Sequence, residues 1–286
     1  PARVVRLARD GRTLGDFGAD VFGVLKHGEP EAIGVRPDGV VVVVTRKPSK
    51  ADQGRVLTFA SDGTLLESIP FPIIHTSANS IDFRPDGTYL FAFYDAQLVV
   101  LETDERTVIR RGWSVPETDT ADGTPNPRPY DVAAAEDGGL WIASAGFRPA
   151  VYRLRPDGGI GRVWRRLSDA PGHVTSPSGV AVAAGPDGRP RLFVADAVGH
   201  RIVRFAWDGT FEAEWRDGPG DVRLYKPNHL AAAPDGTLWV ADTGNLRAVH
   251  YDQEGNVLGV VDHTSTPGAG LKEPVGIAVA PDGSLR

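Results

Sequence analysis

Two amino acids are missing from this chain of 286 residues, which contains no cysteine and no methionine. Without cysteine there can be no disulfide, no thiolate ligand for a metal and no cysteine nucleophile. The first residues lack the apolar core of a signal peptide, and no apolar run approaches the roughly 20 residues of a membrane span. We expect a soluble protein, present as a mature product, a cut piece or an engineered chain. The sequence does not decide in which compartment the protein acts, and a secreted or periplasmic protein is one option.

Positive charge is also scarce. The chain has 31 Lys and Arg residues against 37 Asp and Glu, which gives a formal net charge of −6. No basic run and no motif of stacking aromatic residues accompanies this balance, so nucleic acid is not an expected partner. We expect a monomer, unless the chain belongs to a larger protein.

Turn-forming residues, by contrast, are plentiful, with 34 Gly and 23 Pro. An Asp-Gly pair separates two short apolar runs at six places that lie 47 to 51 residues apart. Gly suits such a turn because it adopts the left-handed conformation without strain. A fixed period of this length, with about four short apolar runs in each repeat, predicts the blades of a β-propeller. The six glycines are Gly39, Gly87, Gly138, Gly188, Gly236 and Gly283.

We therefore predict an all-β fold, a six-bladed β-propeller of four-stranded antiparallel blades, as a single domain over residues 1–286. The first residues resemble the second half of a repeat and the last residues its first half. The N- and C-terminal strands are thus predicted to share one blade and close the ring, which removes exposed strand edges. An open fragment of a longer array is the alternative. The predicted blades cover residues 30–70, 78–112, 129–165, 177–216, 227–262, and 273–286 together with 1–18.

The fourth and fifth repeats carry a family resemblance. Residues 192–202 and 238–248 each contain Leu-x-Val-Ala-Asp followed by Arg and an apolar residue, and this pattern resembles the NHL repeat. The resemblance covers essentially the whole chain and is looser in the first two repeats. It implies a fold more firmly than an activity, because NHL propellers include protein- and RNA-binding platforms, sensor domains and a few enzymes. It also implies that two Asp–Arg sets fix the blades, namely Asp196 with Arg201 and Asp242 with Arg247.

Propellers bind ligands at the mouth of the central channel, where the first strand of each blade begins. When the six first strands are aligned, their first position is mostly polar, whereas the fourth position is small in every repeat except at Asp82. We predict a binding module that holds a protein or a small-molecule ligand at this face. The first position contains Glu31, Asn79, Tyr130, Ser178, Asn228 and Val275, and Asp131 joins the predicted ligand-binding residues from the second position.

Three of these residues offer oxygen ligands for a hard divalent cation such as Ca²⁺, namely Glu31, Asn79 and Asn228. Their place is similar to that of the metal ligands in propellers of the gluconolactonase, or senescence-marker, type. That resemblance implies a metal-dependent hydrolase or lactonase as the second hypothesis. The fourth repeat departs from it, because Ser178 stands where that family places a ligand. The alternative to a metal site is that these polar side chains are simply hydrated at the channel mouth.

Histidines near the same mouth add a further hypothesis. His75 and His173 precede first strands and His229 lies within one, so that with Asp131 they are the candidate catalytic residues, as a general base or as ligands of Zn²⁺. Three His at blade starts are similar to the zinc site of the lyase of peptide amidation, although none here occupies the first position. Ordinary surface histidines are the alternative. The polar segment 113–128 is predicted to be a lid or a surface insertion.

Overall fold

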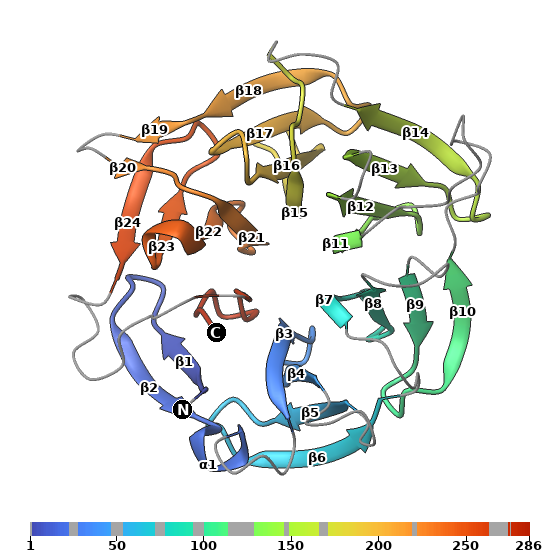
Figure 1. Ribbon diagram of the computed structural model, residues 1–286, viewed down its shortest axis with the longest axis vertical. Coiled ribbons are helices and arrows are strands. Elements are labelled where there is room, and N and C mark those ends of the chain that lie inside the picture. Colours follow the sequence, from blue (N-terminus) through green and yellow to red (C-terminus); the bar gives the residue numbers. More distant parts are fainter. Residues whose placement is uncertain are drawn as a thin grey trace.

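The chain folds into a ring of antiparallel β-sheets around a central channel, as the computed structural model shows (Figure 1). None of the described helices is long and apolar enough to cross a membrane. The structure describes residues 2–22, 28–46, 54–71, 78–93, 100–113, 129–145, 149–165, 171–218, 222–262, 274 and 276–286.

Five sheets in the described part of the chain have four strands each, and within each sheet the strands pair in the order in which they follow one another in the chain. We refer to these sheets as blades 1 to 5. In each blade the first strand lies nearest the channel and the fourth lies at the outside of the ring (Figure 1). The strands are β3 (Glu29–Val35), β4 (Val41–Arg46), β5 (Arg55–Phe59) and β6 (Leu65–Pro70) in blade 1, and β7 (Ala78–Phe83), β8 (Tyr89–Phe93), β9 (Val100–Thr103) and β10 (Ile109–Trp113) in blade 2. They are β11 (Pro129–Ala134), β12 (Leu140–Ser144), β13 (Ala150–Leu154) and β14 (Ile160–Arg165) in blade 3, and β15 (Pro177–Ala184), β16 (Pro190–Asp196), β17 (Arg201–Ala206) and β18 (Phe211–Trp215) in blade 4. Blade 5 contains β21 (Pro227–Ala232), β22 (Leu238–Asp242), β23 (Arg247–Tyr251) and β24 (Val257–Val261).

The Asp-Gly turns behave as the sequence predicts. All six glycines of the repeat have a positive φ, between 72° and 87°. In each turn the preceding Asp accepts a hydrogen bond from the backbone N–H two residues further on, at 2.9 to 3.2 Å. Asp therefore closes the turn and Gly supplies the left-handed residue, which explains why this pair recurs in every repeat.

The core lies between neighbouring blades. The second strand of each blade is buried on both faces, as in β8, where every residue from Tyr89 to Phe93 is buried. Val42 and Val44 of blade 1 share a cluster with Ile81 and Phe91 of blade 2. Burying one such side chain contributes about 1.5–3 kcal/mol. Each blade thus covers the apolar face of the next, as repeat proteins require.

The two ends of the chain meet between blade 5 and blade 1 (Figure 1). There β1 (Val4–Leu7) pairs with β2 (Thr13–Phe17), and α1 (Ala19–Phe22) follows. Leu7 and Leu285 exchange two backbone hydrogen bonds of 2.9 and 2.8 Å, and Ala278 and Arg286 exchange two more. The described residues form five four-stranded blades, and the predicted sixth blade is not confirmed, because one isolated bridge, between Leu7 and Leu285, joins the described part of the C-terminal segment to β1.

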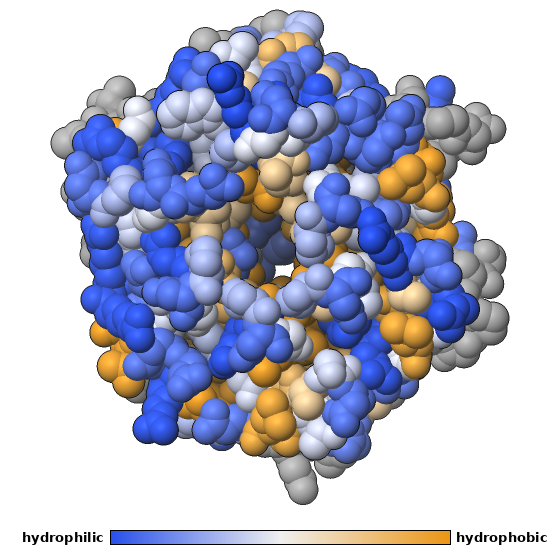
Figure 2. Space-filling view, turned by 180° about the vertical axis from the view of Figure 1, so that it is seen from behind, coloured by the Kyte–Doolittle hydropathy of each residue, from blue (hydrophilic) through white to orange (hydrophobic). Residues whose placement is uncertain are grey.

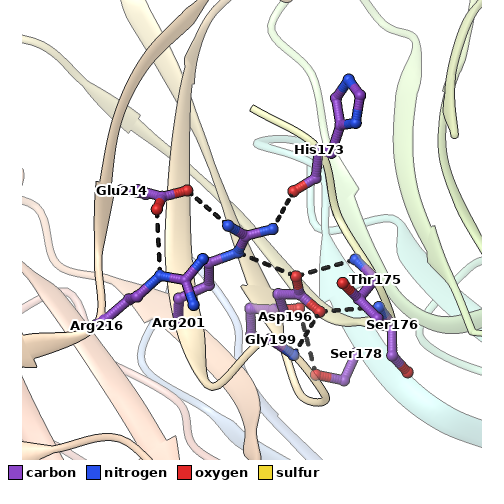
Figure 3. A network of polar contacts seen from close by, with 10 residues as sticks. His173, Thr175, Ser176, Ser178, Asp196, Gly199, Arg201, Glu214 and Arg216 are labelled. Atoms are coloured by element: carbon purple, nitrogen blue, oxygen red, sulfur yellow. Dashed lines mark hydrogen bonds and ion pairs between the residues drawn. The ribbon is translucent and has the colours of Figure 1, made fainter. Parts of the chain in front are cut away.

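A buried polar network holds blade 4 together (Figure 3). The Asp196 carboxylate accepts hydrogen bonds from the backbone N–H groups of Thr175 and Ser176 at 2.9 and 2.8 Å. Arg201 lies 3.1 Å from Asp196 and 2.7 Å from Glu214, and both members of the Asp196–Arg201 pair are buried. In blade 5, Asp242 similarly accepts hydrogen bonds from Tyr225 N, Asn245 Nδ2 and Arg247 Nε. The blade-fixing role expected for these Asp and Arg residues is confirmed.

Candidate functional site

A cavity of about 190 Å³ occupies the central channel. It is lined by β3, β7, β11, β15 and β21 together with residues 276–279. Figure 2 shows the channel as an opening at the centre of the molecule. The side chains that these five strands direct into the ring therefore decide what the channel can hold.

Small residues predominate at the second and fourth positions of these strands because the next blade lies very close. A Cβ atom at Gly179 would come within 2.6 Å of the backbone oxygen of Asn228, and one at Gly34 would lie 2.6 Å from Phe83. Real Cβ atoms do not approach so closely, so at these two places the packing of neighbouring strands demands glycine. Four polar residues at the second and fourth positions line the cavity: Asp82, Asp131 and His229, which are exceptions to the repeat, and Ser80, which is polar but small.

Asp131 is buried, as is Ser80. Its carboxylate accepts hydrogen bonds from the hydroxyl of Ser80 and from the backbone N–H groups of Val132 and Val180, the last two at 2.9 Å. Burial raises the pKa of Asp131, while the nearby His229 and these hydrogen bonds act in the opposite direction. The residue thus links blades 2, 3 and 4 and still brings a carboxylate to the cavity.

Asp82 places a second carboxylate in the same lining. Its Oδ2 atom accepts a hydrogen bond of 2.7 Å from the backbone N–H of Ala134, across the boundary between blades 2 and 3. Burial raises the pKa of Asp82 to about 6, and the negative charge of Asp131 contributes to that shift. A carboxyl with a raised pKa in a cavity is a common property of functional sites.

His229 brings an imidazole to this pair of carboxylates. Its Nδ1 atom lies 3.7 Å from Oδ2 of Asp131, and its side chain is only 12% exposed. This distance is longer than a hydrogen bond, so Asp131 and His229 are near neighbours whose charges can interact. The structure brings together Asp131 and His229, two of the candidate catalytic residues.

Two residues of the first position connect blades. Nδ2 of Asn79 donates a hydrogen bond of 3.0 Å to the carbonyl of Pro129, and the hydroxyl of Ser178 donates one of 2.8 Å to the carbonyl of Pro227. Each of these prolines begins the innermost strand of the next blade. These two side chains therefore have a structural role whether or not they bind a ligand.

The other predicted residues are placed as follows. Glu31 lies 3.6 Å from the guanidinium of Arg46. Tyr130 and Asn228 are half-buried at the same level of their strands. His173 contributes its carbonyl oxygen to Arg201, and its imidazole points away from the Asp196 network (Figure 3). His75, Val275 and residues 114–128 of the predicted lid lie outside the described residues.

The metal site stays a prediction. In the described part of the chain, no group of three or more His, Asp and Glu side chains is placed to hold a metal ion. The predicted set of Glu31, Asn79 and Asn228 depends instead on two amide oxygens. Because Asn79 donates through its nitrogen, a cation at this place would have to bind its Oδ1 atom.

Two members of the site, Ser80 and Asp82, were not among the predicted site residues. The signal that could have found Asp82 is its departure from the small residues at the fourth position. Ser80 carries no such signal, because serine is itself small. Its importance follows from its hydrogen bond to Asp131, which only the structure shows.

Comparisons with known proteins concern the fold. No protein-family model matches the sequence, and a search of curated proteins gives no match. A virginiamycin B lyase from Staphylococcus aureus, solved as an inactive variant with quinupristin, is similar at 16% identity over 91% of this chain and 80% of that one, with a TM-score of 0.60. A gluconolactonase from Xanthomonas campestris is similar at 19% identity over 89% and 81%, with a TM-score of 0.61. A Bacteroides caccae protein of unknown function is similar at 16% identity over 96% and 94%, with a TM-score of 0.66. Together with the strand order, these likenesses establish that the chain has a β-propeller fold.

Proposed function

We propose that this propeller is a binding module that holds a small ligand in its central channel. Asp82, Asp131 and His229 recognise the ligand, and the first-position residues surround it at the mouth. One observation carries the proposal: four polar side chains converge in one cavity at positions where packing favours Gly or Ala. The first-position residues are Glu31, Asn79, Tyr130, Ser178 and Asn228.

The chemistry of the cavity indicates what the ligand offers. Removing carboxylates from water costs free energy unless they gain hydrogen bonds or a positive charge. A ligand with N–H groups or a cationic group supplies both to Asp82 and Asp131. A volume of about 190 Å³ is smaller than the roughly 300–1,000 Å³ of typical drug-sized sites, so the channel suits a small molecule or one arm of a larger one.

A metal-dependent hydrolase, lactonase or lyase is the second candidate function. The observation that favours it is the closeness of His229, a candidate general base, to Asp131. In such an enzyme Glu31, Asn79 and Asn228 would hold a hard divalent cation such as Ca²⁺, and the histidines would be the ligands if the metal were Zn²⁺; either ion would polarise a substrate oxygen or a bound water. The fold shared with a gluconolactonase and a lyase supports the same candidate.

We also propose the finer assignment of the fold as a six-bladed propeller of the NHL type. The bonds of Leu7 with Leu285 support a sixth blade shared by the two ends of the chain. The arrangement of Asp196 with Arg201, repeated in blade 5 by Asp242 with Arg247, supports the NHL assignment.

A fragment screen by ligand-observed NMR tests the binding function. The screen compares the wild type with Asp82→Asn, His229→Asn and the control Glu254→Gln, which removes an exposed charge far from the channel. We expect small amines to bind the wild type and the control, and to lose at least tenfold in affinity with either channel variant. Fragments that bind all four proteins equally would contradict the proposal.

Metal analysis decides between the two candidates. Metal content and thermal melts are measured in EDTA and with added Ca²⁺ or Zn²⁺, for the wild type and for Glu31→Gln and Asn228→Ala. A stoichiometric ion that both variants lose would favour the hydrolase, and a screen of lactones and esters would follow. Melting curves that no metal shifts would favour the binding module.

A further inference from the structure

The two carboxylates of the channel lie at different depths. Asp131 occupies the second position of the innermost strand of blade 3, whereas Asp82 occupies the fourth position of that strand in blade 2. Both residues line the cavity of about 190 Å³. The separation of the carboxylates along the channel therefore limits which ligands can reach both of them.

The innermost strands run in register, so a position in one blade can be compared with the same position in the next. Asn79 and Ser178 both occupy the first position, and each donates a hydrogen bond to the carbonyl of the proline that begins the next innermost strand, at 3.0 and 2.8 Å. Blades 2 and 3 are thus related in the same way as blades 4 and 5. A difference of two positions then corresponds to about 6–7 Å along the strands.

The hydrogen bonds of the two carboxylates show the same offset. Asp131 accepts a hydrogen bond of 2.9 Å from the backbone N–H of Val180, at the third position of blade 4. Asp82 accepts one of 2.7 Å from the backbone N–H of Ala134, at the fifth position of blade 3. Each carboxylate thus reaches one position deeper than its own residue, and the two charges remain two positions apart. A carboxylate can accept about four hydrogen bonds, so both can still accept a donor from a ligand.

The lining supplies little positive charge to balance these carboxylates. Among the described residues that line the cavity none is Lys or Arg, and the imidazole of His229 lies 3.7 Å from Asp131. Arg84, two residues after Asp82, is paired with Glu102 at 2.7 Å. The negative charge of Asp131 contributes to the raised pKa of Asp82, as expected for like charges in one cavity. A ligand with two positive charges would relieve this repulsion, whereas a monoamine would leave one carboxylate without a cation.

The wall between the two carboxylates is apolar. The third and fourth positions of blades 3 and 4 carry only Val and Ala, and these residues line the cavity: Val132, Ala133, Val180 and Ala181. Deeper than Asp82, at the fifth position, the described lining residues are apolar as well. A ligand therefore needs an apolar spacer between its charges and finds no polar side chain beyond Asp82 in this lining. The fifth-position residues are Val35, Phe83, Ala134, Val182, Ala232 and Val279.

We propose that the ligand of the channel is a short linear diamine, with one ammonium group at Asp131 and the other at Asp82. This inference rests on the proposed binding function and names the class of its ligand. An extended chain of about four or five CH₂ groups places two nitrogen atoms roughly 6–7.5 Å apart, which matches the offset of the carboxylates. The CH₂ groups then lie against the Val and Ala side chains of the wall and are removed from water.

Isothermal titration calorimetry of the intact protein with linear diamines of increasing length tests this inference. The series runs from 1,2-diaminoethane to 1,6-diaminohexane, and n-butylamine is the matched monoamine. We expect the affinity to be highest for 1,4-diaminobutane or 1,5-diaminopentane. The best diamine should bind at least tenfold more tightly than n-butylamine, because its second ammonium group adds a charge-assisted hydrogen bond.

The ratio of the diamine affinity to the n-butylamine affinity is the readout in the variants. With Asp82→Asn or Asp131→Asn a single carboxylate remains, so the ratio should fall to about one. The control Glu254→Gln removes an exposed charge far from the channel and should keep the ratio of the wild type. Asp131 also holds backbone groups of blades 3 and 4. If Asp131→Asn does not fold, the length series of the wild type and Asp82→Asn decide the question.

The outcomes separate this inference from the binding function on which it rests. Diamines that bind no more tightly than n-butylamine would overturn the inference and leave the binding function standing. An affinity without a maximum at intermediate length, or a ratio that Asp82→Asn leaves unchanged, would overturn it in the same way. If no amine of either kind bound, the binding function would be contradicted together with the inference.

Discussion

Asp82 is expected to make the protein less stable at neutral pH than at acidic pH. Its carboxyl group is ionised at neutral pH, although the buried position favours the neutral form. The pKa of Asp82 is raised to about 6, against 3.8 for an ordinary aspartate. A raised folded-state pKa means that protonated Asp82 adds stability below about pH 4, and that this contribution is lost as the pH rises through 6. At 1.36 kcal/mol for each pKa unit, the ionised form costs about 1–3 kcal/mol at pH 8.

The substitution Asp82→Asn removes this charge and keeps an oxygen that can accept the hydrogen bond from Ala134. We expect the variant to be more stable than the wild type at pH 8 by about 1–3 kcal/mol, or several degrees in Tm. The difference should shrink towards zero near pH 4. Urea denaturation at pH 4, 6 and 8, with Glu254→Gln as the charge-matched control, measures it. A variant that is less stable than the wild type by the same amount at every pH would refute the reasoning.

Three further substitutions follow from the fold. Arg201→Ala leaves the buried Asp196 carboxylate without its cation, so we expect the free energy of unfolding, measured by chemical denaturation, to fall by about 3–5 kcal/mol. A fall of less than about 1 kcal/mol would contradict the importance of the buried network. Gly179→Ala places a Cβ atom against the backbone of blade 5, whereas the Cβ atom of Gly39→Ala meets no other atom. Gly39→Ala costs only the left-handed conformation of that residue, about 1 kcal/mol, so Gly179→Ala should lose more stability. Equal losses would argue against the tight packing of the innermost strands. Burial lowers the pKa of His250 to about 4, below its usual 6.5, so this residue makes the protein lose stability as the pH falls from 6.5 towards 4. The substitution His250→Phe keeps a ring against Trp239 and should flatten that part of the plot of stability against pH. An unchanged plot would contradict the assignment.

The repeat pattern predicted most of the fold because each repeat carries its own local signals. Asp-Gly turns, short apolar strands and the Asp–Arg sets all act within one repeat, and the structure forms them as predicted. The sixth blade is the exception. It depends on pairing between Leu7 and Leu285, at opposite ends of the chain, and in the described residues that pairing is one isolated bridge.

The site was predictable only in part, because the direction of a side chain in the ring depends on the neighbouring blade. Asp131 and His229 were identified from their place near the mouth, and the structure places them 3.7 Å apart. The sequence could not show that Asn79 and Ser178 hold carbonyls of the next blade. Asp82 was noticed as an irregular residue and its contact with blade 3 was not foreseen.

The contacts between the loops of blades 4 and 5 were not foreseen at all. No role had been assigned to His200, and nothing in the sequence marks Lys226 and Leu246 as left-handed residues, since such conformations are rare outside glycine. The contact between the tilted rings of His200 and Tyr225 joins loops of two blades. Contacts of this kind arise only after the ring has formed.

The central claim is that the channel binds a small ligand at Asp82, Asp131 and His229. A crystal structure of the protein soaked with the amine fragment that binds best tests this claim most directly. We expect density for the fragment between the two carboxylates and the imidazole, with its nitrogen within hydrogen-bond distance of Asp82 or Asp131. A fragment bound elsewhere, with only water in the channel, would contradict the account.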